Sequence, residues 1–247
     1  MRMVVIIPTY NEAEVIGSLI DNLQRELREI SRHEFKILVV DANSPDGTAD
    51  IVLGLKSQYG NIDLLAEPER RGLGYAYLAG MKHALNKMNA DAIIEFDGDF
   101  QHDPADIKRL VAEFDNGYDY VIGSRYVEGG EIPNEWSMRQ KFLSKYGSWF
   151  IRKTLNLPTY DNTSGFKLSR VSGFMENLPL DEDKILSRYH AYKIHFLYEM
   201  LKMGAKTMEV PIKFFERAGG SSKSTYLDIF ESLKVVFVLK LRDLFKS

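Results

Sequence analysis

The sequence predicts an α/β protein built on a doubly wound, mostly parallel sheet. Apolar runs rich in Val and Ile alternate with segments of helical periodicity over residues 1–126, which is the pattern of repeated strand–helix units. A polar cluster follows each of five such runs, as expected where the carboxyl ends of parallel strands share one ligand-binding edge. The length of 247 residues suits one large domain or two small ones.

Each element of this first part follows from its own pattern. The run MVVIIP ends at Pro8 and is typical of a buried strand, and the segment after it has helical spacing with Asn11 as the expected N-cap. A second helix is expected to end near Gly60. In chain order we expect strands at 3–8, 35–41, 62–68, 91–99 and 118–126, separated by helices at 11–30, 46–60, 72–88 and 103–117.

The pattern changes after residue 126. The expected elements there are a Gly-rich loop at 127–136, a basic amphipathic helix at 137–157, a turn and strand at 159–170, a helix at 193–204, a strand at 206–215 and a Gly/Ser loop at 216–224. No Pro/Gly-rich linker separates these segments. We therefore expect one domain at residues 1–226, followed by an amphipathic helix at 227–247.

Composition excludes several classes of protein. A net charge of −3 is no basis for nucleic acid binding. The absence of cysteine excludes disulfides, thiolate nucleophiles and Cys-ligated metals, and it fits a reducing, cytoplasmic compartment. The apolar run at the N-terminus is too short for a signal peptide. No segment approaches the roughly 18–20 apolar residues that span a bilayer.

The stretch FDGDFQHDP places two carboxylates, Asp97 and Asp99, at the end of an expected strand. Alternate residues of an extended segment point the same way, so both side chains can face one spot. Two carboxylates so near each other favour binding of a hard divalent cation, Mg²⁺ or Mn²⁺. Gln101 and His102 are further candidate ligands. The alternative is a polar turn, and Asp103 is interpreted as a cap for the helix that begins at Pro104.

Two other polar clusters fall on the same expected edge. Asp41 ends the second strand and either belongs to a turn or accepts hydrogen bonds from a nucleoside. In the cluster PTYNE, Pro8 ends the strand, Tyr10 can stack on a nucleobase, and Glu12 can hold a ribose or a base edge. The alternatives for Asn11 and Glu12 are a cap and a favourable first-turn charge.

Taken together, six segments resemble the inverting glycosyltransferases of family 2, and among these the dolichol-phosphate (polyprenyl-phosphate) mannosyltransferases. The segments are IIPTYNE at 6–12, VVDANSPDGT at 39–48, RGLGYAY at 71–77, DGDFQHDP at 97–104, GSRY at 123–126 and EVPIKFFERAGGSSK at 209–223. The resemblance covers nearly the whole chain. It implies a GT-A fold, a nucleotide-sugar donor such as GDP-mannose, a divalent metal, and a polyprenyl-phosphate acceptor at the cytosolic face of a membrane.

The resemblance also implies roles for particular residues. The family's nucleotide pocket corresponds to Pro8, Tyr10, Glu12 and Asp41. Its metal and diphosphate site corresponds to Asp97, Asp99 and Gln101. Cationic positions near the phosphates correspond to Arg125, Arg217 and Lys223, and the acceptor-phosphate contact corresponds to Ser144. Within this set, Asp99, Arg125, Ser144 and Arg217 are the expected catalytic residues.

Three departures from the family pattern leave the specificity open. Ala42 follows Asp41 where relatives usually show a second acid, so the base of the donor is open between GDP and UDP. Gln140 stands where many relatives have arginine, with Arg139 and Lys141 beside it. Lys193 and His195 stand where relatives often show glutamine and glutamate, although a packed helix residue is the simpler interpretation of His195. A UDP-sugar transferase, a non-lipid acceptor and a non-catalytic scaffold are the alternatives.

The implied chemistry needs few protein groups. A lipid phosphate is already ionised near neutral pH, so its oxygen can attack the anomeric carbon without a strong base, and a single displacement inverts that carbon. The C-terminal segment 227–247 has apolar residues at helical spacing with interleaved Lys and Arg, which fits either a helix in the membrane interface or a core helix with a solvated face. The protein is then peripheral by itself or is held by a small membrane-anchoring partner.

Overall fold

In the computed structural model the described residues are 1–217 and 226–245, and they form seven strands and seven α-helices. The strands are β1 (Arg2–Thr9), β2 (Glu34–Asp41), β3 (Ile62–Ala66), β4 (Ala92–Glu95), β5 (Tyr120–Ser124), β6 (Lys167–Arg170) and β7 (Thr207–Pro211). The helices are α1 (Ile16–Arg28), α2 (Thr48–Tyr59), α3 (Leu73–Lys87), α4 (Ile107–Asp115), α5 (Met138–Leu155), α6 (Tyr192–Lys202) and α7 (Tyr226–Phe245). Two short 3₁₀ helices lie at Pro104–Asp106 and Met175–Asn177.

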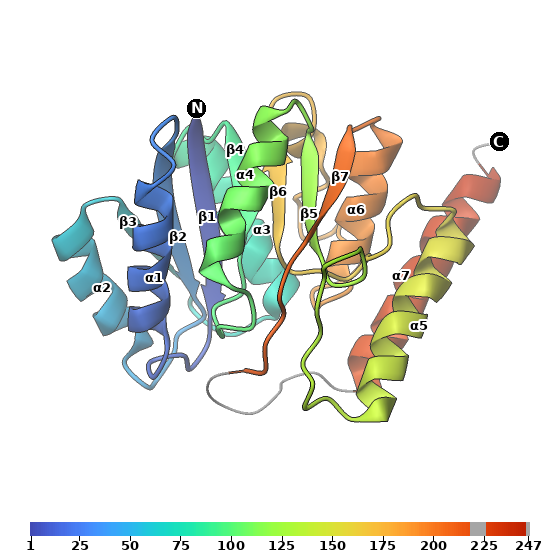
Figure 1. The fold of residues 1–247 in the computed structure, drawn as a ribbon, viewed down its shortest axis with the longest axis horizontal. Helices are drawn as coiled ribbons and strands as arrows, with labels where there is room; N and C mark the ends of the chain where they lie inside the picture. The colour runs from blue at the N-terminus through green and yellow to red at the C-terminus, as the bar shows by residue number, and fades with distance from the viewer. Residues whose placement is uncertain (218–225, 246–247) are drawn as a thin grey trace.

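All seven strands belong to one sheet with the order β3-β2-β1-β4-β6-β5-β7 (Figure 1). Only β6 is antiparallel to its neighbours, β4 and β5, and the other strand pairs are parallel. The predicted fold class, a doubly wound and mostly parallel α/β sheet, is confirmed. The strand expected within residues 159–170 is β6, and it lies between β4 and β5 in the sheet.

Helices cover both faces of the sheet, and β1 shows how the sequence divides between them. Met3, Val5 and Ile7 pack with residues of α1 and α4 on one face. Val4 and Ile6 pack with residues of α3 and α6 on the other. All five side chains are buried, and their alternation follows from the two-residue period of a strand. An almost unbroken apolar run is therefore required, because neither face of a central strand meets water.

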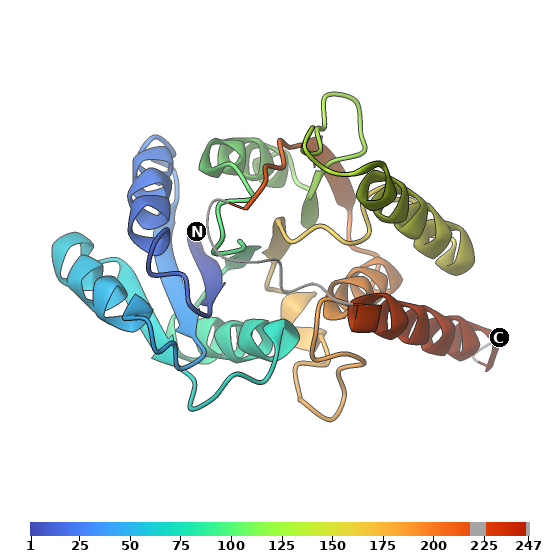
Figure 2. The same cartoon turned by 90° about the horizontal axis from the view of Figure 1, so that it is seen from below.

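Near β7, α5 and α7 lie side by side beyond the main layers (Figures 1 and 2). Val235, Val236 and Leu239 bury one side of α7 in the core, and Ile151 and Leu155 do the same for α5. The opposite sides of both helices expose apolar residues. Among the helices of residues 1–217 and 226–245, none has the length and apolarity needed to cross a lipid bilayer.

The predicted start of the first helix was wrong. α1 begins at Ile16, and Asn11 is not its cap but has a left-handed backbone with φ of 56°. Residues 11–13 instead form a loop whose amides bond the turn after β2: Asn11 N donates to Ser44 Oγ over 3.0 Å, and Ala13 N donates to Asp46 Oδ2 over 3.0 Å. The backbone N–H groups of this loop therefore find their acceptors in a segment distant in the sequence, and Asn11 does not act as a local helix cap.

The carboxyl ends of the parallel strands share one edge, which Figure 2 shows from below. Thr9 at the end of β1 lies in register with Asp41 at the end of β2, and the loop with Asp97 and Asp99 follows β4 directly. The 3₁₀ helix after that loop is capped by Asp103, whose side chain accepts a hydrogen bond from Ala105 N over 2.9 Å. The cap predicted at Asp103 is confirmed.

Candidate active site

Asp97 lies just beyond β4 and is surrounded by donors from the protein. Its Oδ1 accepts a hydrogen bond from the Tyr77 hydroxyl over 2.9 Å, and its Oδ2 lies 3.2 Å from Lys193 Nζ. His102 Nε2 lies 3.6 Å from the same Oδ2. Burial alone raises the pKa of a carboxyl, but the charge of Lys193 and the neighbouring His102 outweigh it, so the pKa of Asp97 lies well below its ordinary value. Asp97 is a carboxylate at neutral pH.

Asp99 is bound by an arginine that also reaches the first loop. Its Oδ2 accepts hydrogen bonds from Arg217 Nη2 over 2.6 Å and from Nε over 3.2 Å, and its Oδ1 accepts one from Gln101 N over 3.1 Å. Arg217 Nη1 lies 3.7 Å from Glu12 Oε1. Burial lowers the pKa of Arg217, but Asp99 and Glu12 outweigh that effect and raise it. Four of the predicted site residues thus lie together: Glu12, Asp99, Gln101 and Arg217.

Three residues at this edge carry the type of ligand atom that a hard divalent ion prefers, although Asp97 and Asp99 are each paired with a protein cation. Asp97, Asp99 and Gln101 supply carboxylate and amide oxygens, the ligand type that Mg²⁺ and Mn²⁺ prefer. Across the described parts of the chain, no group of three His, Cys, Asp or Glu side chains could hold a metal ion. A metal bound here would therefore need several ligands from water and substrate, as Mg²⁺ commonly takes.

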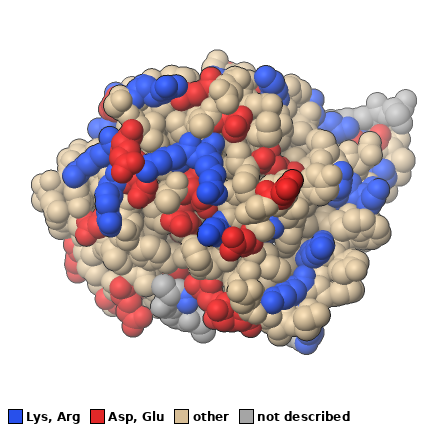
Figure 3. All heavy atoms as spheres, viewed as in Figure 1, with Lys and Arg blue, Asp and Glu red and all other residues tan. Residues whose placement is uncertain are grey.

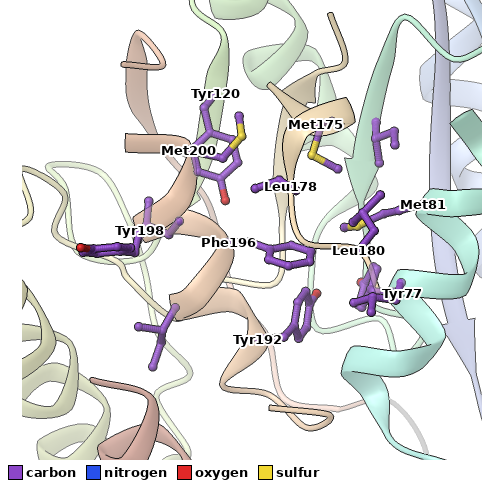
Figure 4. Packing of buried hydrophobic residues seen from close by; sticks show 14 of the residues in the cluster. Tyr77, Met81, Tyr120, Met175, Leu178, Leu180, Tyr192, Phe196, Tyr198 and Met200 are labelled. Carbon is purple, nitrogen blue, oxygen red and sulfur yellow. The ribbon is translucent and has the colours of Figure 1, made fainter. Parts of the chain in front are cut away.

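Behind Asp97 lies a buried polar network that the sequence did not reveal. Tyr192 of α6 donates to Glu95 Oε2 over 2.6 Å, and its ring stacks on that of Tyr77 with centroids 5.3 Å apart. Figure 4 shows both tyrosines pointing into the core cluster between α3 and α6. Lys167 of β6 is fully buried, and its Nζ donates to the Lys193 carbonyl over 3.2 Å. Burial lowers the pKa of Lys167 to about 8 and raises the pKa of Glu95.

Asp41 is bound by its own neighbourhood. Its Oδ1 accepts from Thr9 Oγ1 over 2.9 Å and from Ser44 Oγ over 2.6 Å, and its Oδ2 accepts from Ser44 N over 2.9 Å. This is the turn role that the sequence left open for Asp41. Pro8 lies in β1, and its carbonyl oxygen would be 2.9 Å from a Cβ at Gly98. The glycine between the two aspartates therefore lets their loop pass close to β1.

Tyr10 lies on the first loop under an arginine. The Arg70 guanidinium lies 4.6 Å from the centre of the Tyr10 ring, close enough for a cation–π interaction. Tyr10 is partly exposed, whereas Glu12 two residues on is buried. The sequence indicated Tyr10 as a stacking residue. Arg70 belongs to the polar cluster after β3 but lies just before the motif RGLGYAY, so no role was predicted for it.

Arg125 lies deeper than the sequence suggested. Its Nε and Nη2 each donate over 2.7 Å to one oxygen of Asp161, which is fully buried, and Nη2 also donates to Thr163 Oγ1 over 2.9 Å. Burial lowers the pKa of Arg125, but the paired Asp161 raises it by a larger amount. The pKa therefore lies above its ordinary value, and the guanidinium stays charged. The next residue, Tyr126, forms a short hydrogen bond between its hydroxyl and Ser144 Oγ. The structure thus joins Arg125 and Ser144 through Tyr126, and the predicted phosphate contact of Arg125 stays a prediction.

Lys223 lies outside the described residues. His195 is fully buried in α6, as the simpler interpretation of the sequence expected. The sequence missed Asp161, Arg70 and the role of Tyr77. Tyr77 falls within the segment RGLGYAY, so its motif was a usable signal, whereas Asp161 is separated from its partner Arg125 by 36 positions.

The sequence matches the family model described as "Glycosyl transferase family 2" over residues 4–178. It is 34% identical over 223 residues to an undecaprenyl-phosphate mannosyltransferase of Micrococcus luteus, covering 90% of this chain and 87% of the relative. It is 33% identical over 233 residues to a polyprenol monophosphomannose synthase of Mycolicibacterium smegmatis, covering 94% of this chain and 84% of the relative.

A solved structure of a mannosyltransferase from Pyrobaculum calidifontis, in complex with GDP-mannose and Mn²⁺, has the same fold. The TM-score is 0.58 at 19% identity, and the match covers 100% of this chain and 64% of that one. This likeness shows the fold alone. The family match extends over more than half of the chain, and two relatives above 30% identity span most of it. The resemblance inferred from six motifs is confirmed: the chain is an enzyme with the GT-A fold and belongs to glycosyltransferase family 2.

Proposed function

We propose that this enzyme transfers mannose from GDP-mannose to a polyprenyl phosphate. One relative is named an undecaprenyl-phosphate mannosyltransferase and the other a polyprenol monophosphomannose synthase. The neighbour from Pyrobaculum calidifontis holds GDP-mannose and Mn²⁺. The acceptor phosphate oxygen forms a bond to the anomeric carbon while the bond from that carbon to the donor diphosphate breaks. GDP leaves, and the configuration at the anomeric carbon inverts.

The observation that carries this proposal is the position of Arg217. Its guanidinium lies between Glu12 on the first loop and Asp99 after β4, at the carboxyl edge of the sheet. That is where nucleotide ligands bind in open α/β sheets. A cation held by two carboxylates can exchange one of them for a phosphate when donor binds. Arg217, with Lys223 in the same motif, is proposed to hold the donor diphosphate as it becomes the leaving group.

Asp97, Asp99 and Gln101 are proposed to hold Mg²⁺ or Mn²⁺. When bound, the ion would neutralise negative charge on the diphosphate. Lys193 and Arg217 already bind oxygens of the two aspartates, so a divalent ion would compete with these cations for the same oxygens. Pro8, Tyr10, Glu12 and Asp41 are proposed to form the nucleotide pocket, with Tyr10 as the stacking residue and Asp41 shaping the loop that Ser44 completes.

The acceptor phosphate is proposed to meet Ser144 in the second turn of α5. Ser144 is oriented by its hydrogen bond with Tyr126, and Tyr126 follows Arg125, whose guanidinium is anchored by Asp161. We therefore assign Arg125 a positioning role.

The acceptor is a lipid, and α5 with α7 is proposed to dock on the membrane surface that contains it. Trp149 of α5 is 54% exposed and Phe230 of α7 is 68% exposed. Lys and Arg side chains are interleaved with them, and Figure 3 shows scattered basic groups on a largely uncharged surface where α5 lies. A helix with exposed aromatic and basic residues suits the headgroup region of a bilayer. We place the enzyme peripherally at the cytosolic face.

A donor panel tests the proposed reaction. The enzyme is incubated with GDP-mannose, UDP-glucose or UDP-N-acetylglucosamine, with and without a short-chain polyprenyl phosphate, and with Mn²⁺ or a chelator. We expect a lipid-linked mannose, detected by mass spectrometry, only with GDP-mannose and the lipid phosphate, and a β linkage by NMR. If only a UDP-sugar gives product, the proposed donor is wrong. If product forms without the lipid phosphate, the proposed acceptor is wrong.

Asp99→Ala tests the site. The variant loses a carboxylate that is proposed to bind metal and that also holds Arg217, so we expect the initial rate of mannose transfer to fall by about 100-fold or more. Asp103→Ala is the matched control, because Asp103 lies four residues on and only caps the next helix. It is expected to lose about 1 kcal/mol of stability and little activity. An active, folded Asp99→Ala enzyme would overturn the assignment.

A further inference from the structure

Lys193 places a buried ammonium group beside the first aspartate of the site. The residue lies on α6, its side chain is 5% exposed, and its Nζ lies 3.2 Å from Asp97 Oδ2. The Asp97 side chain is 21% exposed, so the aspartate is the more accessible member of this partly buried pair. A lysine buried to this extent needs a charged partner, and Asp97 is that partner.

The surroundings hold this pair in place. A Cβ at Gly165 would lie 2.2 Å from Asp97 Oδ2 and 2.4 Å from Lys193 Nζ, so only glycine leaves room for the pair at that point. Tyr77 bonds the other oxygen of Asp97, and His102 Nε2 lies 3.6 Å from Oδ2. The ammonium is therefore a packed part of the site and not a side chain that happens to reach it.

A lysine in this position competes with a metal ion for the same carboxylate. A divalent ion bound to Asp97 would have to come within about 2.2 Å of one of its oxygens. Lys193 would then lie within a few ångströms of a second cation in a partly buried site, where repulsion between like charges is strong. At the same time, the ammonium supplies positive charge at the edge where the diphosphate is expected.

We propose that Lys193 is a built-in cation of the donor-diphosphate site, which supplies from the protein part of the charge that a divalent ion would otherwise supply. This inference rests on the proposed function, because it assumes a nucleoside diphosphate at this edge. It assigns Lys193 a positioning role through Asp97. Its consequence is that nucleotide binding by this enzyme depends less on divalent metal than it would with a neutral residue at position 193.

The test compares Lys193→Gln with Lys202→Gln in the full-length protein. Lys202 is a matched control, since it lies on the same helix and pairs with Asp243 over 2.7 Å far from the site. GDP affinity is measured by calorimetry with a chelator and with Mn²⁺, and Mn²⁺ affinity is measured by electron paramagnetic resonance in the presence of GDP. We expect Lys193→Gln to bind Mn²⁺ about tenfold more tightly and metal-free GDP about tenfold more weakly, and Lys202→Gln to change neither.

A folded Lys193→Gln protein with both affinities unchanged would overturn the inference. Circular dichroism establishes folding, and Lys193→Met, which preserves the length of the side chain without its charge, replaces the variant if the glutamine protein is unfolded. The wild type gives an independent measure: GDP affinity should fall by less than about tenfold when Mn²⁺ is chelated, and a loss of 100-fold or more would contradict us. Failure to transfer mannose, with these affinities as expected, would overturn the proposed reaction alone.

Discussion

At the scale of single residues, the site is built from charges that are taken out of water and paired. Asp97 meets Lys193, Asp99 meets Arg217, and Arg125 meets Asp161. Pairs of this kind add little net stability, because desolvation offsets attraction, but they are costly to break. Their value here is position: each fixes a charged group at or just behind the edge where two anionic substrates would meet.

The buried pair of Arg125 and Asp161 makes a prediction about stability. Asp161→Ala leaves a buried guanidinium without its carboxylate, and we expect the free energy of unfolding in urea to fall by about 3–5 kcal/mol. Asp63→Ala is the control, since Asp63 pairs with Lys56 over 2.8 Å on the surface, and a loss below about 1 kcal/mol is expected there. Equal losses of unfolding free energy in the two variants would show that breaking the buried pair costs no more than breaking the surface pair.

Lys167 makes a prediction about pH. Its pKa is about 8 in the folded protein against an ordinary value of 10.5, because it is buried. As the pH rises from 8 towards 10.5 the folded protein releases this proton while the unfolded chain keeps it, so the lysine's contribution to stability increases with pH. The full increase is on the order of 3 kcal/mol.

Lys167→Met removes this contribution because methionine does not titrate. Urea unfolding of both proteins at about pH 7.5 and about pH 10 isolates it, since other groups titrate alike in each. We expect the wild type to gain stability relative to Lys167→Met over this interval. A constant difference between the two proteins would show that Lys167 titrates normally in the fold.

At the scale of elements, close packing between α3 and the sheet determines where the site's tyrosine lies. A Cβ at Gly80 would lie 2.6 Å from Ile6 Cγ2 and 3.0 Å from Val40 Cγ2. The glycine thus allows α3 to approach β1 and β2. Tyr77 lies one turn earlier on the same helix, and from that position its hydroxyl reaches Asp97.

Gly80→Ala is therefore expected to destabilise the protein by about 1–3 kcal/mol, because a methyl group would overpack this contact. Gly54→Ala is the paired experiment, since Gly54 lies in α2 with no atom within 4 Å of an added Cβ. There alanine should stabilise the helix by up to about 1 kcal/mol. Thermal unfolding measures both, and two changes of the same sign would contradict the packing argument.

Many element positions were predictable, and the exceptions share a cause. The strands at β1, β2 and β3 and the helices α2, α3 and α7 lie close to the expected ranges, because apolar periodicity directly reports burial. The predicted start of α1 at Asn11 was wrong, because the backbone amides of Asn11 and Ala13 bond the side chains of Ser44 and Asp46. These distant partners keep residues 11–13 in a loop, and the helix begins later. The antiparallel direction of β6 also depends on neighbours that no local pattern specifies.

At the scale of the whole molecule, α5 and α7 give the domain one side unlike the others. α7 packs Val235, Val236 and Leu239 inward and exposes apolar residues outward. One side of the helix belongs to the core, and binding of the other side to a membrane interface stays a prediction. The division proposed at residue 226 stays a prediction, although α7 packs against α5 and α6.

Membrane docking is tested at this scale with substitutions that leave the core side of α7 intact. We expect the double variant Phe230→Glu with Phe237→Glu to bind liposomes containing polyprenyl phosphate about tenfold or more weakly in sedimentation. Leu53→Glu is the control, because Leu53 is also exposed but lies on α2 at the other end of the sheet. Unchanged binding by the double variant would remove α7 from the docking surface.

The sequence by itself determined the fold class, the edge at which polar residues gather, and the family, because periodicity and motif spacing are local properties of the chain. Only the tertiary structure decided which charges meet. Lys193 is 96 positions from Asp97, and Arg217 is 118 positions from Asp99. Such pairs form because the sheet order β1-β4-β6 and the packing of α6 bring distant segments to one edge, and electrostatic partnership depends on distance in space, which a linear pattern does not encode.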